Sequence, residues 1–407
     1  MSQPSDRYLV ISSDCHAGLP GAKYRDWVDP EYREMFDVAF PMQESEVLRL
    51  TRKFMPDEFK EAWRRDTGDG WHGAWDSAER NRQLDADGIA GEVIFPDGVN
   101  DGNLPPFGAG LTLPPEVPSD LIWAGAKAHN RWIAGFCQEE PKRRAGMAVI
   151  PMAHDPVRAV EEIRWARANG LRGVFIGPLW GKHEPYHSPV YEPVWSVCEE
   201  LDMPINIHGG AAPTEDYGDH PGNIGIFITE VAWWSTRPAW FLIWSGVFER
   251  HPKLKFVITE LGASWVPELK ALMDQRFEAN HFTAKLAPYR TELTMKPSEY
   301  FDRNIWVGAS VTSRVDVEMR HKIGVDRMMW GSDFPHPEGA WPYTRKFMAE
   351  SFHDIPDADV RQMLGLTAAK VYGFDVEALA PLVAKIGPRA EDLSLAAAEP
   401  KLAAGDR

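Results

Sequence analysis

The stretch Gly173–Gly210, GVFIGPLWGKHEPYHSPVYEPVWSVCEELDMPINIHGG, contains one complete succession of strand, helix and strand. Its two apolar runs, GVFIGPL from Gly173 and PINIHGG from Pro204, are short and bounded by Gly or Pro, which is typical of buried strands. Between them, SPVYEPVWSVCEELDMP begins with Ser-Pro and is stopped by Pro204, which predicts a helix. Two strands joined by a helical crossover indicate a parallel sheet.

The same alternation continues through the chain. Six more apolar runs follow this pattern: YLVISSD from Tyr8, GEVIFPD from Gly91, RAGMAVIPM from Arg144, KFVITELG from Lys255, NIWVGAS from Asn304 and RMMWGSD from Arg327. Eight runs, most of them followed by an amphipathic helix, predict an α/β fold, the (β/α)₈ TIM-type barrel of about 250 core residues. We expect residues 1–380 to form this single barrel domain.

Three segments do not fit a minimal barrel. Residues 20–80 separate the first run from the second and are charged and rich in Trp, so we expect a helical insertion after the first strand that caps the barrel mouth. Residues 101–120, DGNLPPFGAGLTLPPEVPSD, are rich in Pro and Gly and predict a loop, which we interpret as a lid. Residues 381–407 are poor in aromatic side chains and predict a flexible tail.

Charge and cysteine content indicate which class of partner the protein lacks and in which cellular compartment it works. The 407 residues include 60 acidic and 44 basic ones, and a net charge of −16 argues against a nucleic-acid partner. Three widely spaced cysteines form neither a disulfide framework nor a CxxC pair, and the N-terminus does not resemble a secretory signal. We therefore expect a cytoplasmic protein.

One stretch, Val231–Phe248, is unusually apolar and aromatic. It contains Arg237 and Pro238 and falls short of the roughly 20 apolar residues that cross a bilayer, so it predicts a buried helix and no membrane partner. Aromatic surface on such a helix usually meets a partner, and a homodimer is the simplest form in which that surface closes.

The candidate functional residues lie where the predicted strands end, because barrel enzymes carry their sites at the carboxyl ends of the strands. Asp14 and His16 are two apart on the first strand and therefore point to the same face. The later strand ends contribute His208, Glu260 and Asp333, with His336 three residues beyond. Asp14 or Asp333 could each cap a helix instead, but their combination with two histidines favours a metal site. Imidazole and carboxylate ligands suit Zn²⁺, Fe²⁺ or Mn²⁺.

Several motifs together resemble the amidohydrolase superfamily, in particular the branch typified by aminocarboxymuconate-semialdehyde decarboxylase. They are SDCHAG, GLRGVFIGPLWG, YEPVWSVCEELDMPINIHGG, GVFERHPKLKFVITELG, DRMMWGSDFPHPEG and LGLTAAKVYGFD, and they span residues 8–375. The resemblance implies four metal ligands: Asp14, His16, His208 and Asp333. This chain has Asp14 where the decarboxylase has His, and Glu260 where the branch usually has a His that assists with metal-bound water. The second departure disfavours decarboxylation.

These features lead us to expect a metal-dependent hydrolase for an amide, ester, lactone or thioester of a bulky apolar small molecule. A bound metal would lower the pKa of its water to about 7 and polarise the carbonyl. The expected catalytic residues are Asp333, Glu260 and His336, and Glu260 and His336 are also candidate ligands for a second ion, so we expect one or two ions per chain. The alternative reaction is metal-dependent, non-oxidative decarboxylation, for which Arg237 or Arg314 would have to hold a substrate carboxylate. A binding module with a closed metal site is a third hypothesis.

Overall fold

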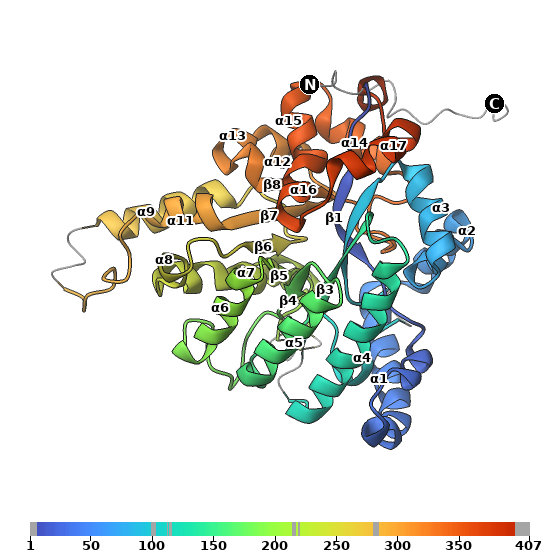
Figure 1. Ribbon diagram of the computed structural model, residues 1–407, viewed down its shortest axis with the longest axis horizontal. Helices are drawn as coiled ribbons and strands as arrows, with labels where there is room; N and C mark the ends of the chain where they lie inside the picture. Colours follow the sequence, from blue (N-terminus) through green and yellow to red (C-terminus); the bar gives the residue numbers. More distant parts are fainter. Residues whose placement is uncertain are drawn as a thin grey trace.

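The computed structural model describes residues 6–98, 103–111, 113, 116–213, 217–218, 220–279 and 285–394. Eight parallel strands follow one another in chain order around a barrel (Figure 1). Their bounds are β1 Ile11–His16, β2 Gly91–Phe95, β3 Arg144–Val149, β4 Gly173–Phe175, β5 Ile205–His208, β6 Phe256–Thr259, β7 Ile305–Ser310 and β8 Met328–Gly331. Seven strands lie within predicted runs and β1 extends two residues past the first run, to His16, so the predicted (β/α)₈ fold is confirmed.

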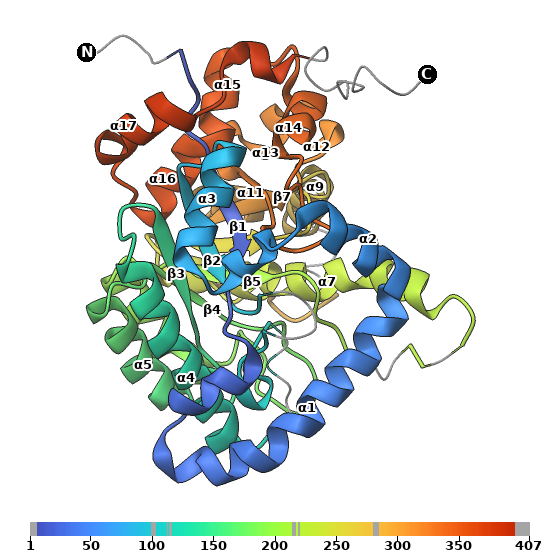
Figure 2. The same cartoon turned by 90° about the vertical axis from the view of Figure 1, so that its right-hand side faces the viewer.

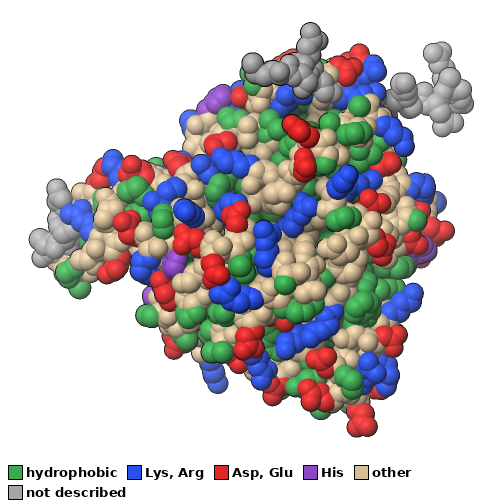
Figure 3. Space-filling model, in the orientation of Figure 1, with side chains coloured by type: hydrophobic (Ala, Val, Ile, Leu, Met, Phe, Trp, Pro, Cys, Tyr) green, Lys and Arg blue, Asp and Glu red, His purple; other side chains and the backbone are tan. Residues whose placement is uncertain are grey.

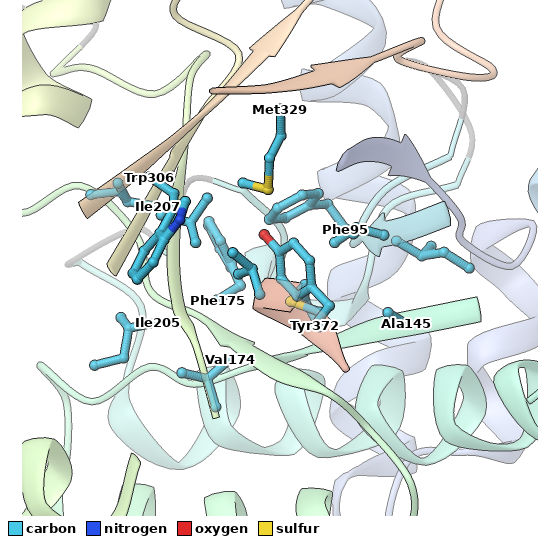
Figure 4. Packing of buried hydrophobic residues seen from close by; sticks show 14 of the residues in the cluster. Phe95, Ala145, Val174, Phe175, Ile205, Ile207, Trp306, Met329 and Tyr372 are labelled. Carbon is cyan, nitrogen blue, oxygen red and sulfur yellow. The ribbon is translucent and has the colours of Figure 1, made fainter. Parts of the chain in front are cut away.

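The barrel closes between its last and first strands. The backbone N–H of Asp333 donates to the carbonyl of Asp14 at 2.8 Å, and that of His16 donates to Phe334 at 2.7 Å. Buried apolar side chains from several strands pack together, including Phe95, Phe175 and Ile207 (Figure 4). Strands buried on both faces explain why the runs are continuously apolar rather than alternating.

Helices cover the outside of the barrel. Those between β2 and β6 are α4 Ser119–Gln138, α5 Pro156–Ala168, α6 Glu192–Glu200, α7 Asn223–Trp244 and α8 Val247–Arg250. The later ones are α9 Val266–Glu278, α11 Pro297–Asn304, α12 Arg314–Glu318, α13 Arg320–Ile323, α14 Thr344–Phe352, α15 Asp357–Arg361, α16 Thr367–Tyr372 and α17 Val376–Ile386. Helices α9 and α11 project from the barrel as a pair (Figure 1).

The predicted insertion after the first strand is helical. It contains α1 Arg33–Phe54, α2 Asp57–Thr67 and α3 Ser77–Asp87, and α1 and α2 lie outside the barrel (Figure 2). Arg80 of α3 is fully buried and pairs with Glu92 of β2 at 2.6 Å. The same guanidinium donates to the carbonyls of Gly73 and His16, each at 2.9 Å. The insertion is thereby anchored at the carboxyl end of β1.

The described part of the predicted lid forms turns until helix α4 begins at Ser119. Residues 106–108 form a short 3-10 turn, and the Asn103 side chain donates to the carbonyl of Gly18 at 2.9 Å. Residues 101, 102, 112, 114 and 115 of this segment lie outside the described residues. Opening and closing of the loop remains a prediction.

The predicted tail begins too early. Residues 381–386 complete α17, where Leu379, Val383 and Ile386 are buried. Leu393 is buried as well, in the 3-10 turn 390–393. The spacing of four and three residues between these apolar side chains is helical, and their burial keeps this segment in the folded domain. Residues 395–407 of the predicted tail lie outside the described residues.

The aromatic stretch Val231–Phe248 lies mostly in α7. One side of α7 packs on the barrel through Pro238, Ala239 and Leu242, whereas Trp233 is 48% exposed, so only one face of the predicted buried helix is buried. In the part of the chain that is described, no helix is both long and apolar enough to cross a membrane. Acidic and basic side chains are interspersed on the face drawn in Figure 3.

The Arg80–Glu92 pair provides a test of this architecture. Glu92→Gln leaves the buried guanidiniums of Arg80 and Arg144 without their carboxylate, and we expect it to lower the free energy of unfolding by about 3–5 kcal/mol. Urea unfolding followed by circular dichroism measures this change. Glu200→Gln removes one partner of the exposed Arg164–Glu200 pair and should leave the midpoint unchanged. Equal midpoints for Glu92→Gln and the wild type would contradict this role for the pair.

Candidate metal centre

The predicted ligands converge at the carboxyl ends of the strands. Asp14 and His16 end β1, His208 ends β5, and all three side chains are fully buried. The Asp14 Oδ1 atom lies 3.3 Å from His16 Nε2 and 3.1 Å from His208 Nε2. The period of two along β1 thus brings Asp14 and His16 to the same face, as predicted.

His16 is oriented by the backbone. Its Nδ1 atom lies 3.0 Å from the carbonyl oxygen of Pro96. Because a carbonyl oxygen only accepts, Nδ1 carries a proton and donates. Nε2 then faces Asp14 and Asp333 and is the nitrogen that a metal would take.

His208 is held in the same manner. Its Nδ1 atom lies 3.1 Å from the carbonyl oxygen of Gly209 and 3.2 Å from Glu260 Oε2, while Nε2 faces Asp14. A metal-binding histidine commonly donates its other N–H to a carbonyl or carboxylate in this way. Glu260 therefore contacts the side of His208 that points away from Asp14.

Asp333 and His336 complete the other side of the cluster. Asp333 Oδ1 lies 3.2 Å from His16 Nε2 and 3.0 Å from His336 Nδ1. The imidazole rings of His16 and His336 stack with their centroids 3.8 Å apart. Three buried atoms of this group make no hydrogen bond: His16 Nε2, Asp333 Oδ1 and His336 Nε2.

The backbone at two of these strand ends is strained. Glu260 has φ of 64° and Asp333 has φ of 59°, in the left-handed region that residues with a side chain rarely adopt. Glu260 directly follows β6, and Asp333 is the second residue after β8. Such strain persists only where surrounding structure imposes it and is concentrated at functional sites.

The charges of the cluster stabilise one another. Burial lowers the pKa of His16, but its contacts with Asp14 and Asp333 outweigh burial and raise that pKa to about 10. Burial raises the pKa of Asp14, but His208 and His16 outweigh it and hold that pKa well below its usual range. These contacts favour ionised carboxylates and protonated imidazoles when no cation is bound, and a cation would displace protons from the imidazoles as it bound.

The donor set fits a divalent cation. Potential ligand atoms within 4.8 Å of one another form three groups: Asp14, His16 and His208; His16, Asp333 and His336; and Glu260, Asp333, His336 and Glu338. The first two groups share His16 and consist of buried imidazole nitrogens and carboxylate oxygens. Buried ligand atoms that lack a hydrogen-bond partner at the centre of such a group are what a cation would satisfy.

Two neighbours of the cluster were not among the predicted residues. Ser310, at the end of β7, donates from Oγ to Asp14 Oδ2. The strand-end rule would have found it, because NIWVGAS ends in this serine. Glu338 follows His336 by two residues, is exposed, and has no such signal in the sequence.

The two candidate arginines differ in their surroundings. Arg314 pairs with Glu318 at 3.0 Å and donates to the carbonyls of Ser351 and His353, so it has a structural role. Arg237 stacks on aromatic rings of α7 instead. Neither arginine contacts the residues of the metal cluster through a hydrogen bond or ion pair among the described residues.

Comparison with known proteins identifies related sequences and folds. The sequence profile of the amidohydrolase family matches residues 117–374, more than half of the chain. Gamma-resorcylate decarboxylase of Rhodococcus jostii (strain RHA1) is 27% identical over 270 residues, 61% of this chain and 77% of that protein. The 2-amino-3-carboxymuconate-6-semialdehyde decarboxylase of Dictyostelium discoideum is 25% identical over 311 residues, 74% of this chain and 77% of that protein.

The fold has solved counterparts as well. The crystal structure of 5-carboxyvanillate decarboxylase from Novosphingobium aromaticivorans, in complex with manganese and 4-hydroxy-3-methoxy-5-nitrobenzoic acid, superposes with a TM-score of 0.65. The two chains are 19% identical, and the superposition covers 90% of this chain and 97% of that one. At this identity the likeness supports the barrel fold.

The comparisons correct one prediction. Hydrolysis was the expected reaction, but the sequence relatives are named as decarboxylases, so that expectation is wrong and the alternative is the better one. The reason is chemical: the same carboxylate and imidazole ligands serve both reactions. The replacement of a histidine by Glu260 was therefore too weak a basis for choosing hydrolysis.

Metal analysis tests the centre. We expect His208→Ala to lose most of the divalent metal found in the wild type, because His208 Nε2 faces Asp14. Glu260→Gln should keep the wild-type number of ions but bind them about 10- to 100-fold more weakly, because Glu260 contacts the opposite nitrogen of His208. Elemental analysis after equilibration at graded metal concentrations measures both values.

The control is His321→Ala, which changes an exposed histidine that pairs with Asp359 and belongs to none of the candidate ligand groups. It should leave metal content unchanged. Loss of one whole ion of two in Glu260→Gln would instead make Glu260 a ligand of a second ion. Full metal content in His208→Ala would contradict the centre described here.

Proposed function

The chain belongs to the amidohydrolase family, and from that premise we propose that it is a metal-dependent, non-oxidative decarboxylase of aromatic carboxylic acids. The observation that carries the proposal is that relatives matching most of the barrel are named as decarboxylases, among them one for gamma-resorcylate. The cluster at the strand ends supplies the residue types that this chemistry requires. Substrate class and reaction both rest on these relatives.

We propose that the resident cofactor is a divalent cation held by Asp14, His16, His208 and Asp333. Manganese is the first candidate, because the solved 5-carboxyvanillate decarboxylase contains it and because carboxylate and imidazole ligands suit it. When bound, the cation would draw electron density from the substrate's carboxylate and neighbouring oxygen. Glu260, through Nδ1 of His208, would fix the orientation of that ligand.

Decarboxylation needs one proton and no oxidant. The bond between the ring carbon and the carboxyl carbon breaks, its electron pair stays on the ring carbon, CO₂ leaves, and a proton binds to that carbon. We assign His336 as the proton donor, because its Nδ1 faces Asp333 while its buried Nε2 makes no hydrogen bond. A protonated imidazole in this position presents its Nε2 hydrogen to the reacting carbon.

Asp333 and His16 position the donor. Asp333 Oδ1 lies 3.0 Å from His336 Nδ1, and its negative charge would favour a proton on that nitrogen. The stacked ring of His16, 3.8 Å away, restricts rotation of the His336 imidazole. Burial of the group excludes water from the developing carbanion, so the proton comes from the side chain.

Activity is tested with Mn²⁺-loaded protein and 2,6-dihydroxybenzoate as the first of a series of hydroxylated benzoates. We expect release of CO₂ and a product that carries one deuterium on the ring carbon that had borne the carboxylate when the reaction runs in D₂O. His336→Gln should lower kcat at least about 100-fold at unchanged metal content, as expected for loss of a general acid. His321→Gln is the matched control and should keep full kcat.

Two results would contradict these assignments. Absence of CO₂ release from every acid in the series by metal-loaded protein would refute the proposed function. Full kcat in His336→Gln would leave the reaction in place but remove His336 as its proton donor.

We also propose that the protein is a homodimer that pairs through α7. Four apolar side chains of this helix are exposed: Ile224 at 39%, Ile226 at 50%, Ile228 at 62% and Trp233 at 48%. Beyond them, Trp240, Trp244 and Trp265 line a groove of about 580 Å³ between α7 and α9. An exposed apolar surface of this kind usually marks a protein interface. In a homodimer, a two-fold axis would place the α7 surface of one subunit against the same surface of the other.

Light scattering on the intact chain tests whether the protein is a homodimer. We expect a mass of twice 45.9 kDa for the wild type and a shift toward 45.9 kDa for Ile228→Glu, because a carboxylate in an apolar interface is costly. Val157→Glu changes a residue of α5 that is 72% exposed and should keep the dimer. A wild type that is monomeric at all concentrations would refute the dimer.

A further inference from the structure

A second cavity lies beside the metal centre, between the loop that follows β4 and helix α7. Its volume is about 330 Å³, within the range of roughly 300–1,000 Å³ that is usual for small-molecule sites. The side chains that matter for its chemistry are Trp180, His183, Tyr186, Trp234, Arg237 and Phe241. We call it the α7 cavity.

Arg237 presents an uncompensated charge to this cavity. Its guanidinium carbon lies 5.2 Å, 5.6 Å and 4.8 Å from the ring centroids of Trp233, Trp234 and Phe241. Among the described residues it makes no hydrogen bond and no ion pair, although 26% of the chain is charged. Stacking uses the faces of a guanidinium and leaves its N–H edges available for a planar acceptor.

A second polar group lines the same cavity without a partner. The Nε2 atom of His183 is buried and makes no hydrogen bond. That nitrogen is enclosed by protein, and the His183 ring lies 4.6 Å from that of His154. His183 lines the cavity from the loop after β4 and Arg237 lines it from α7, so the two polar side chains come from different elements.

The remaining walls select for an aromatic ring rather than a bare anion. The indoles of Trp180 and Trp234 lie with ring centroids 6.1 Å apart in an edge-to-face arrangement. The described residues around the α7 cavity include no Asp or Glu that would repel an anion. A planar acid would place its ring against the indoles and its carboxylate against the guanidinium edge.

The α7 cavity is separate from the metal centre but adjoins it. Its described lining contains none of the six predicted metal ligands. The link is Ser235 of α7, whose hydroxyl donates to the backbone carbonyl of His208 at 2.8 Å. One helix therefore contributes Ser235 to the support of the metal centre and Arg237 to the cavity.

We propose that the α7 cavity is a second binding site, for the carboxylate of a single-ring aromatic acid, with Arg237 as its anion-binding residue. Binding there requires neither the metal nor turnover. The proposal thus stands apart from the proposed decarboxylation and can fail or succeed independently of it.

The experiment is isothermal titration of the full-length chain with benzoate. We expect a site with a stoichiometry of one that persists in His208→Ala, where the metal centre is disabled. In that background, Arg237→Gln should weaken benzoate binding at least tenfold, and Arg237→Lys should recover part of the affinity because the charge is restored without the planar fork. Arg167→Gln, on the exposed side of α5, is the matched control and should bind as tightly as its parent.

A second test compares several ligands in a protein whose α7 cavity is unaltered, so its result does not depend on whether a cavity variant folds. In His208→Ala, benzamide and acetate should each bind at least tenfold more weakly than benzoate, because one lacks the charge and the other lacks the ring. Equal affinity for benzamide would overturn the assignment of an anion site. Unchanged binding in Arg237→Gln, or binding that disappears in His208→Ala alone, would overturn the α7 cavity as the site.

Discussion

Two buried carboxylates at the seam of the barrel impose the central constraint on this structure. Asp14 and Asp333 lie on the adjoining ends of β1 and β8, joined by the hydrogen bond from the N–H of Asp333 to the carbonyl of Asp14. Two ionised groups removed from water need compensating charge. His16, His208 and His336 supply it, and they reach the seam only because the barrel is closed.

The surrounding fold holds this charged group in place. Arg80, from the insertion after β1, donates to the carbonyl of His16 and pairs with Glu92, so the insertion restrains the strand that carries two ligands. On the opposite side, Ser235 of α7 donates to the carbonyl of His208. Backbone contacts of this kind, rather than the ligands alone, decide where the imidazole nitrogens point.

The proposed chemistry follows from the same arrangement. A cation between these ligands could serve hydrolysis or decarboxylation. We propose decarboxylation because the sequence relatives are named as decarboxylases. What distinguishes the reactions in the structure is the source of a proton. His336 Nε2 is buried without a hydrogen bond, which is why we propose it as the donor, whereas Glu260 contacts His208.

The sequence by itself determined the eight strands and the strand-end residues Asp14, His16, His208, Glu260 and Asp333, because buried parallel strands are continuous apolar runs and their ends share one edge. It could not show that Arg80 reaches the carbonyl of His16, or that Glu260 faces Nδ1 of His208, because both contacts join segments far apart in the chain. Nor could it show which face of α7 is exposed. Only the tertiary structure decided these features, since they depend on side-chain direction after the barrel has closed.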